Sequence, residues 1–542
     1  MKKTYRSLLV AAAENAATLE KQARLQLELF KYAAEDTSSF SIVGKRTLRK
    51  IAEHYSIATK DRSTSDIASN LADALLGDIL CNEQDAQASL HIVSPPERIQ
   101  VWTKHNLLPT GSTSDMLCNM QVLSENGEEN WQETEKMVLR FGAAFLLTSL
   151  ISNTLIPHCI CGVPERITTN VHLESLNADA ITIALYEHIP GLADAVKKAA
   201  NDNDQFAMLK DLCPAGIQVL GVGSKDEVSA AKLPHLATFN GIGLALQTGA
   251  IDLLMADTLK LSPTVTEAAR SAKTAIVTAN KISHIPDATS LNKNSATLEE
   301  LAKSIVRHAL SSFEDRRTIK PLLPDTSVTA QVGFCKDSID HYYGCMDIMA
   351  SGLIEGKILG IVNLFGDAPA TEEEAIEFSA FTETLLKNNI LLFASGKTAF
   401  TTARNGLCAS NAREKCGRLL NQFLSPSMPP VWHFGEATDN VQQLATLREI
   451  AKYAGHKIKD LPLASVTSNL SAKDSGSTFA LQLSGIDIYH RASTSQHDTP
   501  QHLSTSTQEN LGSTIHAAPN YDELAKIIIS NFTTTRSELC WR

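Results

Sequence analysis

The chain has 542 residues, 43% of them hydrophobic, and a formal net charge of −11. Because this length exceeds what one hydrophobic core normally supports, we expect several domains. The net negative charge argues against nucleic acid or an anionic membrane as the main partner.

The N-terminal residues MKKTYRSLLVAAAENAA superficially resemble a signal peptide. The apolar run Leu8–Ala13 is short and ends at Glu14, which favours an amphipathic helix instead. We find no run of about 18 apolar residues and therefore expect no membrane span. There are ten cysteines and no C-x-x-C pair. A disulfide framework is not expected in a chain of this size without a signal, so we expect a reducing cytoplasm.

Residues 1–165 are predicted to be helical, because RTLRKIAEHY and SDIASNLADALLGDIL have apolar residues at helical spacing. LRFGAAFLLTSLISNTLI indicates a more buried helix. From about residue 166, short apolar runs such as ADAITIALYEHIP and GIQVLGVG alternate with helical stretches, which is typical of βαβ units. The segment TIKPLLPDTSV is predicted to be a linker, and 491–514 a mobile loop. We therefore predict an α/β protein with a helical domain (1–165) and two Rossmann-like parallel-sheet domains (166–325 and 326–542).

Polar residues directly follow several of the predicted strands. In open parallel sheets, ligands bind beyond the carboxyl ends of the strands. That rule nominates these positions as a candidate site, although strands also simply end in polar loops. The residues are His188, Gly223, Ser224, Asp257 to Lys260, Asp367, Lys397, Glu436 and Asp439.

The same strand ends carry a resemblance to nickel–iron–sulfur carbon monoxide dehydrogenases. LNADAITIALYEHIPGLADAV is similar to the family segment that supplies the histidine ligand of the active cluster, and His188 falls on that ligand. Five further segments resemble those that supply cysteine ligands: GIQVLGVGSKDE, QTGAIDLLMADTLKLSP, KILGIVNLFGDAP, NNILLFASGKTAF and PPVWHFGEATDN. The helical region resembles the family too, through KRTLRKIAEHYSIATKDRSTSDIASNLADALL and PPERIQVWTKHNLLPTG. The resemblance implies the prismane-like fold, which the hybrid-cluster proteins share. At the cysteine positions this chain has Gly223, Ser224, Lys260, Asp367, Lys397 and Ala437.

These departures determine the expected function. Iron–sulfur clusters need thiolate ligands, and a mixed nickel cluster needs several held in one cavity. Only His188 keeps its character. The family's N-terminal cysteine-rich segment is missing, and TYRSLLVAAAENAATLEK contains no histidine where the family carries a proton relay. We therefore expect no cofactor and no carbon monoxide dehydrogenase activity.

Two hypotheses compete for the vacated cluster cavity. In the first, Lys260 and Lys397 neutralise Asp367 and Glu436, since an unpaired buried charge costs several kcal/mol. In the second, Lys260, Lys397 and His188 bind a small anion, or one lysine acts as a nucleophile or base. Lys473, in SAKDSGSTFA, lies close to a catalytic lysine of the family.

A third hypothesis is a metalloprotein with new ligands. In H-C-I-C, Cys159 and Cys161 would share one face of a strand and, with His158, could contact zinc. The alternative is a buried structural pair. We expect first a non-catalytic scaffold, accessory or regulatory subunit, acting as a homodimer or with another protein. A cofactor-free enzyme or small-molecule binder is the second expectation, and the metalloprotein the third.

Overall fold

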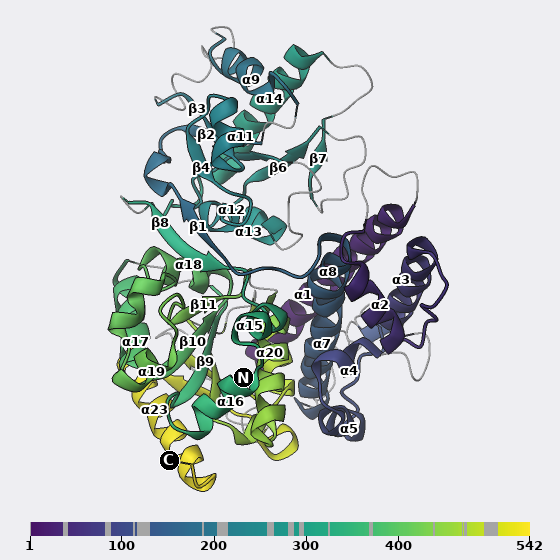
Figure 1. Cartoon of the computed structure of the whole chain (residues 1–542), viewed down its shortest axis with the longest axis vertical. Helices are drawn as coiled ribbons and strands as arrows, with labels where there is room; N and C mark the ends of the chain where they lie inside the picture. The colour runs from purple at the N-terminus through teal and green to yellow at the C-terminus, as the bar shows by residue number, and fades with distance from the viewer. Residues whose placement is uncertain are drawn as a thin grey trace. The chain divides into compact units, whose positions relative to one another are not determined.

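A computed structural model shows two compact units in the chain (Figure 1). The first comprises Met1–Arg166 and Gly333–Arg542, and the second is Ile167–Val332. The second unit is therefore inserted into the first in sequence. The structure describes residues 2–35, 42–81, 88–111, 114–115, 131–186, 189–202, 215–256, 265–279, 287–291, 297–323, 326–367, 372–436, 439–468, 470, 474–492 and 508–541.

The N-terminal part of the first unit is helical, as the apolar spacing predicted. Helix α1 packs against α3 and α7, and Figure 1 shows these helices as neighbours. The buried residues of α3, among them Leu71 and Leu75, recur at helical spacing. The helices are α1 (Lys2–Ala34), α2 (Lys45–His54), α3 (Thr64–Leu80), α4 (Ala88–Val93), α5 (Pro96–Lys104), α7 (Trp131–Leu150), the π-helical turn η1 (Ile151–Leu155) and α8 (Ile156–Cys161).

One helical stretch, Glu133–Cys161, is long and apolar enough to cross a membrane by length and composition. The sequence analysis interpreted LRFGAAFLLTSLISNTLI, which lies within this stretch, as a buried helix. Within the first unit, however, 83% of the most apolar 18-residue segment of this stretch is buried. Burial of this extent is what a core helix requires, and α7 supplies that core with residues such as Phe141 and Leu146.

Helix α7 crosses α21 (Ser475–Leu483) at unusually close range. A Cβ atom on Gly142 of α7 would lie 2.7 Å from the Cβ of Phe479 on α21. Conversely, a Cβ atom on Gly476 of α21 would lie 2.3 Å from the Phe145 ring on α7. Each helix therefore needs glycine where the other places a phenylalanine. This reciprocal contact joins the N-terminal helices to the α/β part of the first unit and fixes the start of α21.

The α/β part of the first unit contains a six-stranded sheet in the order β14-β13-β12-β9-β10-β11. Every neighbouring pair is parallel. The strands are β9 (Gly360–Phe365), β10 (Ile390–Ala394), β11 (Val431–His433), β12 (Leu463–Thr467), β13 (Asp487–Arg491) and β14 (Ile515–Ala518). The helices are α15 (Lys336–Tyr343), α16 (Asp347–Ile354), α17 (Glu372–Lys387), α18 (Gly396–Arg404), η3 (Ser410–Lys415), α19 (Arg418–Phe423), α20 (Asn440–Ala454), η5 (Ile458–Asp460), α21 and α23 (Tyr521–Glu538).

The second unit also has a sheet, in the order β8-β1-β4-β3-β2-β5-β6-β7. Its strands are β1 (Ile167–Val171), β2 (Ile181–Leu185), β3 (Ile217–Val222), β4 (His235–Ala237), β5 (Leu253–Met255), β6 (Ala275–Thr278), β7 (Thr289–Ser290) and β8 (Val328–Val332). Its helices are η2 (Leu173–Ser175), α9 (Leu192–Ala200), α11 (Lys225–Ala230), α12 (Ile242–Leu246), α13 (Val265–Ser271) and α14 (Leu298–Arg316).

The sheet of this unit is mostly parallel, as predicted, but β1 runs antiparallel to both β4 and β8. The chain enters the unit through β1 and leaves it through β8. Two such strands lying side by side must run in opposite directions. The full pairing of β1 with β8 also places residues 328–332 in this unit, whereas the sequence analysis put the second boundary at 325/326.

A buried ion pair ties α14 to the sheet of the second unit. Arg316 Nε lies 2.8 Å from Asp252 Oδ1, and both side chains are at most 2% exposed. The other carboxylate oxygen of Asp252 accepts the backbone N–H of Thr182 at 2.7 Å. Burial raises the pKa of Asp252, and the hydrogen bond and charge of Arg316 oppose that shift. Removing the guanidinium would therefore leave a buried carboxyl group with only the Thr182 N–H to compensate it.

We predict that Arg316→Met lowers the free energy of unfolding by about 3–5 kcal/mol, the range for breaking one side of a buried pair. The matched control is Arg307→Met, an exposed position on the same helix. Urea denaturation followed by circular dichroism measures both. Equal stabilities of the two variants would contradict a structural role for the pair.

Candidate functional site

Four parallel strands of the first unit lie in the order β12-β9-β10-β11, so their carboxyl ends share one edge of the sheet. We call this the carboxyl edge. Asp367 follows β9, Lys397 follows β10, and Glu436 follows β11. The structure therefore brings three of the predicted site residues to one edge, where α/β sheets bind their ligands.

Asp367 and Lys397 form an ion pair at the carboxyl edge. Their Oδ1 and Nζ atoms lie 3.0 Å apart, and the side chains are 27% and 30% exposed, respectively. A lysine ammonium has three N–H donors and no lone pair, so in this state it cannot ligate a metal. The prediction that Lys397 has a carboxylate within reach is confirmed.

The backbone around Asp367 is held by two other residues. The backbone N–H of Asp367 donates to Asp474 Oδ2 at 3.1 Å, and the Ser468 hydroxyl donates to the Asp367 carbonyl at 2.5 Å. Gly366 has a φ of +84°, and a Cβ atom there would lie 2.6 Å from Asp474 Oδ2. The turn after β9 thus requires glycine and a carboxylate at the start of α21.

A similar arrangement follows β11. Asp439 Oδ2 accepts the backbone N–H of Glu436 at 2.8 Å, and both side chains are buried. Gly435 has a φ of +119°, and a Cβ atom there would lie 2.2 Å from Asp439 Oδ2. The backbone N–H of Gly435 donates to His433 Nδ1 at 3.1 Å. Burial lowers the pKa of His433 to about 4, so the imidazole is neutral and Nδ1 is free to accept this bond.

In the second unit, Gly223 and Ser224 follow β3. The Ser224 hydroxyl accepts the backbone N–H of Glu227 at 3.3 Å, and the Glu227 carboxylate accepts the backbone N–H of Ser224 at 2.8 Å. This capping box begins α11. Gly223 has a φ of +140° and presents no side chain. Both residues therefore shape the turn and cap the helix.

Comparison with known proteins agrees with this architecture. The sequence profile that describes the prismane/CO dehydrogenase family matches residues 3–521 of this chain.

The chain belongs to the prismane/CO dehydrogenase family.

Among its relatives, carbon monoxide dehydrogenase 2 of Carboxydothermus hydrogenoformans is 26% identical over 446 residues, which is 79% of this chain and 69% of that protein. Carbon monoxide dehydrogenase 1 of Methanosarcina mazei is 26% identical over 85% of this chain and 74% of its own length.

Solved structures share the fold. The as-isolated, nickel-free carbon monoxide dehydrogenase of Thermococcus sp. AM4 matches with a TM-score of 0.72 at 23% identity, over 99% of this chain and 86% of that one. Carbon monoxide dehydrogenase IV of Carboxydothermus hydrogenoformans also has a TM-score of 0.72, at 22% identity, over 99% and 88% of the two chains. The predicted family resemblance and fold class are confirmed.

Four of the predicted site residues lie outside the described residues, namely His188, Lys260, Ala437 and Lys473, as does Asp257. A shared cavity lined by Lys260, Lys397 and His188 therefore stays a prediction. Part of the segment 491–514 expected to be a mobile loop, residues 493–507, also lies outside them.

The sequence analysis missed Ser468 and Asp474. Ser468 follows β12, whose short run after Pro462 was not recognised as a strand. Asp474 immediately precedes α21, and an aspartate before an apolar helical run is a known start signal. Both residues follow the rules that nominated the others. The hydrogen bond between Asp474 and the turn after β9 could not be predicted, because the two lie far apart in the sequence.

The strand interpretation of His158, Cys159 and Cys161 is wrong, because these residues form the end of helix α8. Residues two apart on a helix point about 200° apart, so the two thiols do not share a face. Burial lowers the pKa of His158 to about 4 and raises that of Cys159 to about 12. Within the described part of the chain, no group of three or more His, Cys, Asp or Glu residues is arranged to hold a metal ion.

We predict that Asp367 and Lys397 are energetically coupled. A double-mutant cycle with Asp367→Asn and Lys397→Met should give a coupling energy of about 1 kcal/mol, the upper end for partly exposed pairs. The more exposed pair Glu355–Lys357 is the control and should give a value near zero. Urea denaturation measures both cycles. Indistinguishable coupling energies would show that the carboxyl-edge pair has no special role.

Proposed function

We propose that this chain is a non-catalytic member of the carbon monoxide dehydrogenase family, without nickel–iron–sulfur or iron–sulfur clusters, that acts as a scaffold, accessory or regulatory subunit. The observation that carries the proposal is the Asp367–Lys397 ion pair. The resemblance assigns both positions to cysteine ligands of the active cluster. In this chain the two positions hold side chains of opposite charge. Asp367 and Lys397 therefore form an ion pair with each other and are not available as metal ligands.

The chemistry of the other donors supports the same conclusion. Gly223 offers no side chain, and the Ser224 hydroxyl is engaged in capping α11. No cysteine occurs in the segments that follow β9, β10, β11 and β12, at 366–371, 395–397, 434–439 and 468–474. Iron–sulfur clusters are held by thiolates, so these residues do not fit the cluster.

The remaining cysteines are consistent with a reducing compartment, where we propose that the protein resides. Seven of those that the structure describes are free thiols, namely Cys159, Cys161, Cys335, Cys345, Cys408, Cys416 and Cys540. Of these, Cys408 is fully enclosed, and burial raises its pKa to about 12. Such a thiol is neutral at physiological pH and behaves as a small apolar residue rather than a ligand.

After anaerobic purification, we expect no stoichiometric nickel or iron and no dye reduction under carbon monoxide, because the carboxyl edge offers no thiolate. Metal analysis and the dye assay test this, with a nickel-containing relative prepared in parallel as the positive control. Several irons per chain, or turnover that exceeds a boiled control and is abolished by His188→Ala, would overturn the proposal.

A scaffold or subunit needs a partner, and we propose a homodimer or a complex with another protein. Stable interfaces usually bury more than about 1,200 Å². Light scattering at low protein concentration should therefore give twice the mass of the 58.7 kDa chain for a homodimer, or a mass above 58.7 kDa for a complex with another protein. A strict monomer with no copurifying protein would remove the main support for the role as a scaffold or subunit. It would not bear on the absence of the clusters, which the metal analysis tests separately.

A further inference from the structure

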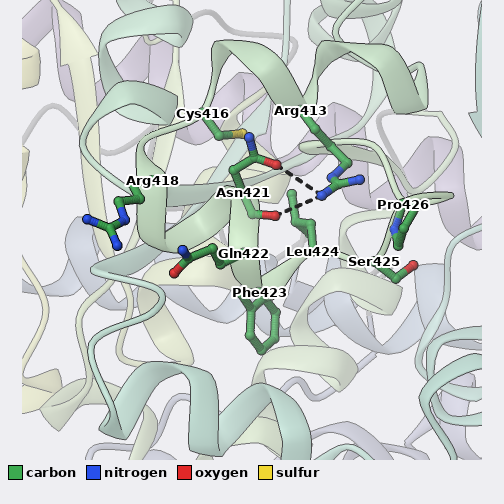
Figure 2. Close-up of a pocket in the computed structure, with 9 residues that line it drawn as sticks. All are labelled: Arg413, Cys416, Arg418, Asn421, Gln422, Phe423, Leu424, Ser425 and Pro426. Carbon is green, nitrogen blue, oxygen red and sulfur yellow. Dashed lines mark hydrogen bonds between the residues drawn. The ribbon is translucent and has the colours of Figure 1, made fainter.

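A surface pocket of about 720 Å³ lies in the first unit, away from the residues discussed above (Figure 2). Its lining comes from one stretch of chain, which includes the end of η3 and all of α19. A volume of this order suits a metabolite-sized ligand. None of the lining residues is acidic; they are Arg413, Cys416, Arg418, Asn421, Gln422, Phe423, Leu424, Ser425 and Pro426.

Arg413 is a half-buried cation in this pocket. Its Nη2 atom donates to the Asn421 carbonyl at 2.9 Å and to Asn421 Oδ1 at 3.0 Å, the two bonds drawn in Figure 2. Its Nε atom is buried without a hydrogen-bond partner. Among the described residues, no carboxylate lies within ion-pair distance of Arg413. A partly buried charge is normally paired, so this arrangement calls for an anion from outside the chain.

The nearby groups do not supply that negative charge. Glu383 is engaged by Lys415 at 2.9 Å and by Lys387 at 3.9 Å. Burial raises the pKa of the Cys416 thiol to about 12, even though Arg413 opposes the shift. Cys416 is therefore neutral at physiological pH.

Arg418 adds a second positive charge. It is exposed and has no ion-pair partner in the part of the chain that the structure describes. Figure 2 shows its guanidinium on one side of the drawn residues and that of Arg413 on the other, with Cys416, Asn421 and Leu424 between them. The same lining includes the half-buried Phe423, whose ring Figure 2 draws below both guanidinium groups, and the buried Leu424.

We propose that this pocket binds a small organic molecule with two oxyanion groups, phosphate or carboxylate, one on Arg413 and one on Arg418. The exposed guanidinium fork of Arg418 matches both kinds of oxyanion bidentately, whereas Arg413, whose Nη2 is engaged by Asn421, donates from Nη1. Asn421 fixes the Arg413 fork before the ligand arrives, which lowers the entropy lost on binding. Such a site is independent of the carboxyl edge and gives the chain a ligand without any metal.

Calorimetric titration of the full chain with pyrophosphate and with succinate, against sodium chloride at equal ionic strength, tests the proposal. At least one of the two dianions should bind saturably, and inorganic phosphate should bind at least about tenfold more weakly because it engages only one guanidinium. Arg418→Gln should weaken dianion binding by about tenfold, and the exposed control Arg307→Gln should leave it unchanged. Arg413→Lys is the second variant; it keeps the positive charge but not the guanidinium held by Asn421, and it should bind the dianion more weakly than the unmodified chain.

Alkylation of Cys416, followed by mass spectrometry, locates the ligand without a variant. The bound dianion should slow modification of Cys416 and leave the exposed Cys540 unaffected. The proposal is overturned if neither dianion binds above the chloride control, if Arg418→Gln binds like the unmodified chain, or if Cys416 is not protected. Binding of acidic peptides alone would equally overturn it, because it would make the pocket a protein-docking groove.

Discussion

A carboxylate that accepts a backbone N–H recurs at three of the strand ends that the family resemblance assigns to the active cluster. Asp474 accepts the N–H of Asp367, Asp439 that of Glu436, and Glu227 that of Ser224. Charge-assisted bonds of this kind are stronger than neutral ones and direct the chain after each strand. The positions of the site residues depend on them, since Asp367 faces Lys397 only while Asp474 holds the turn.

The bond from Asp474 depends in turn on the packing of helix α21 against α7. Asp474 directly precedes α21, whose place is set by the contacts of Gly476 with Phe145 and of Phe479 with Gly142. The helical part of the first unit therefore positions a carboxylate in its α/β part. A larger residue at either glycine would separate the helices and move Asp474 away from the turn it holds.

Part of this arrangement was predictable from the sequence. Asp367 and Lys397 each follow an obvious apolar run, and parallel strands bring such ends to one edge. The family resemblance added that both positions surround a single site. The pairing of Asp474 with Asp367 was not predictable, because it joins residues about a hundred positions apart through helix packing. The H-C-I-C motif failed for another reason: a short apolar run fits a strand and a helix equally well. The antiparallel β1 and β8 follow from how the second unit is inserted, which no local pattern records.

These bonds also bear on how the fold can persist under the proposed function. A loop fixed by metal ligation loses its anchor when the metal is withheld, because the ligation energy is part of the folding energy. A loop whose N–H is bonded to a neighbouring carboxylate keeps its anchor, since the donor and acceptor both belong to the chain. Under the proposed function, the ion pair between Asp367 and Lys397 neutralises charge at two positions where the family resemblance implies thiolates bound to a metal. The fold of a metalloenzyme can thus stay ordered without the metal and without its redox chemistry. The condition is that side chains of the chain itself anchor the loops that metal ligation would otherwise anchor.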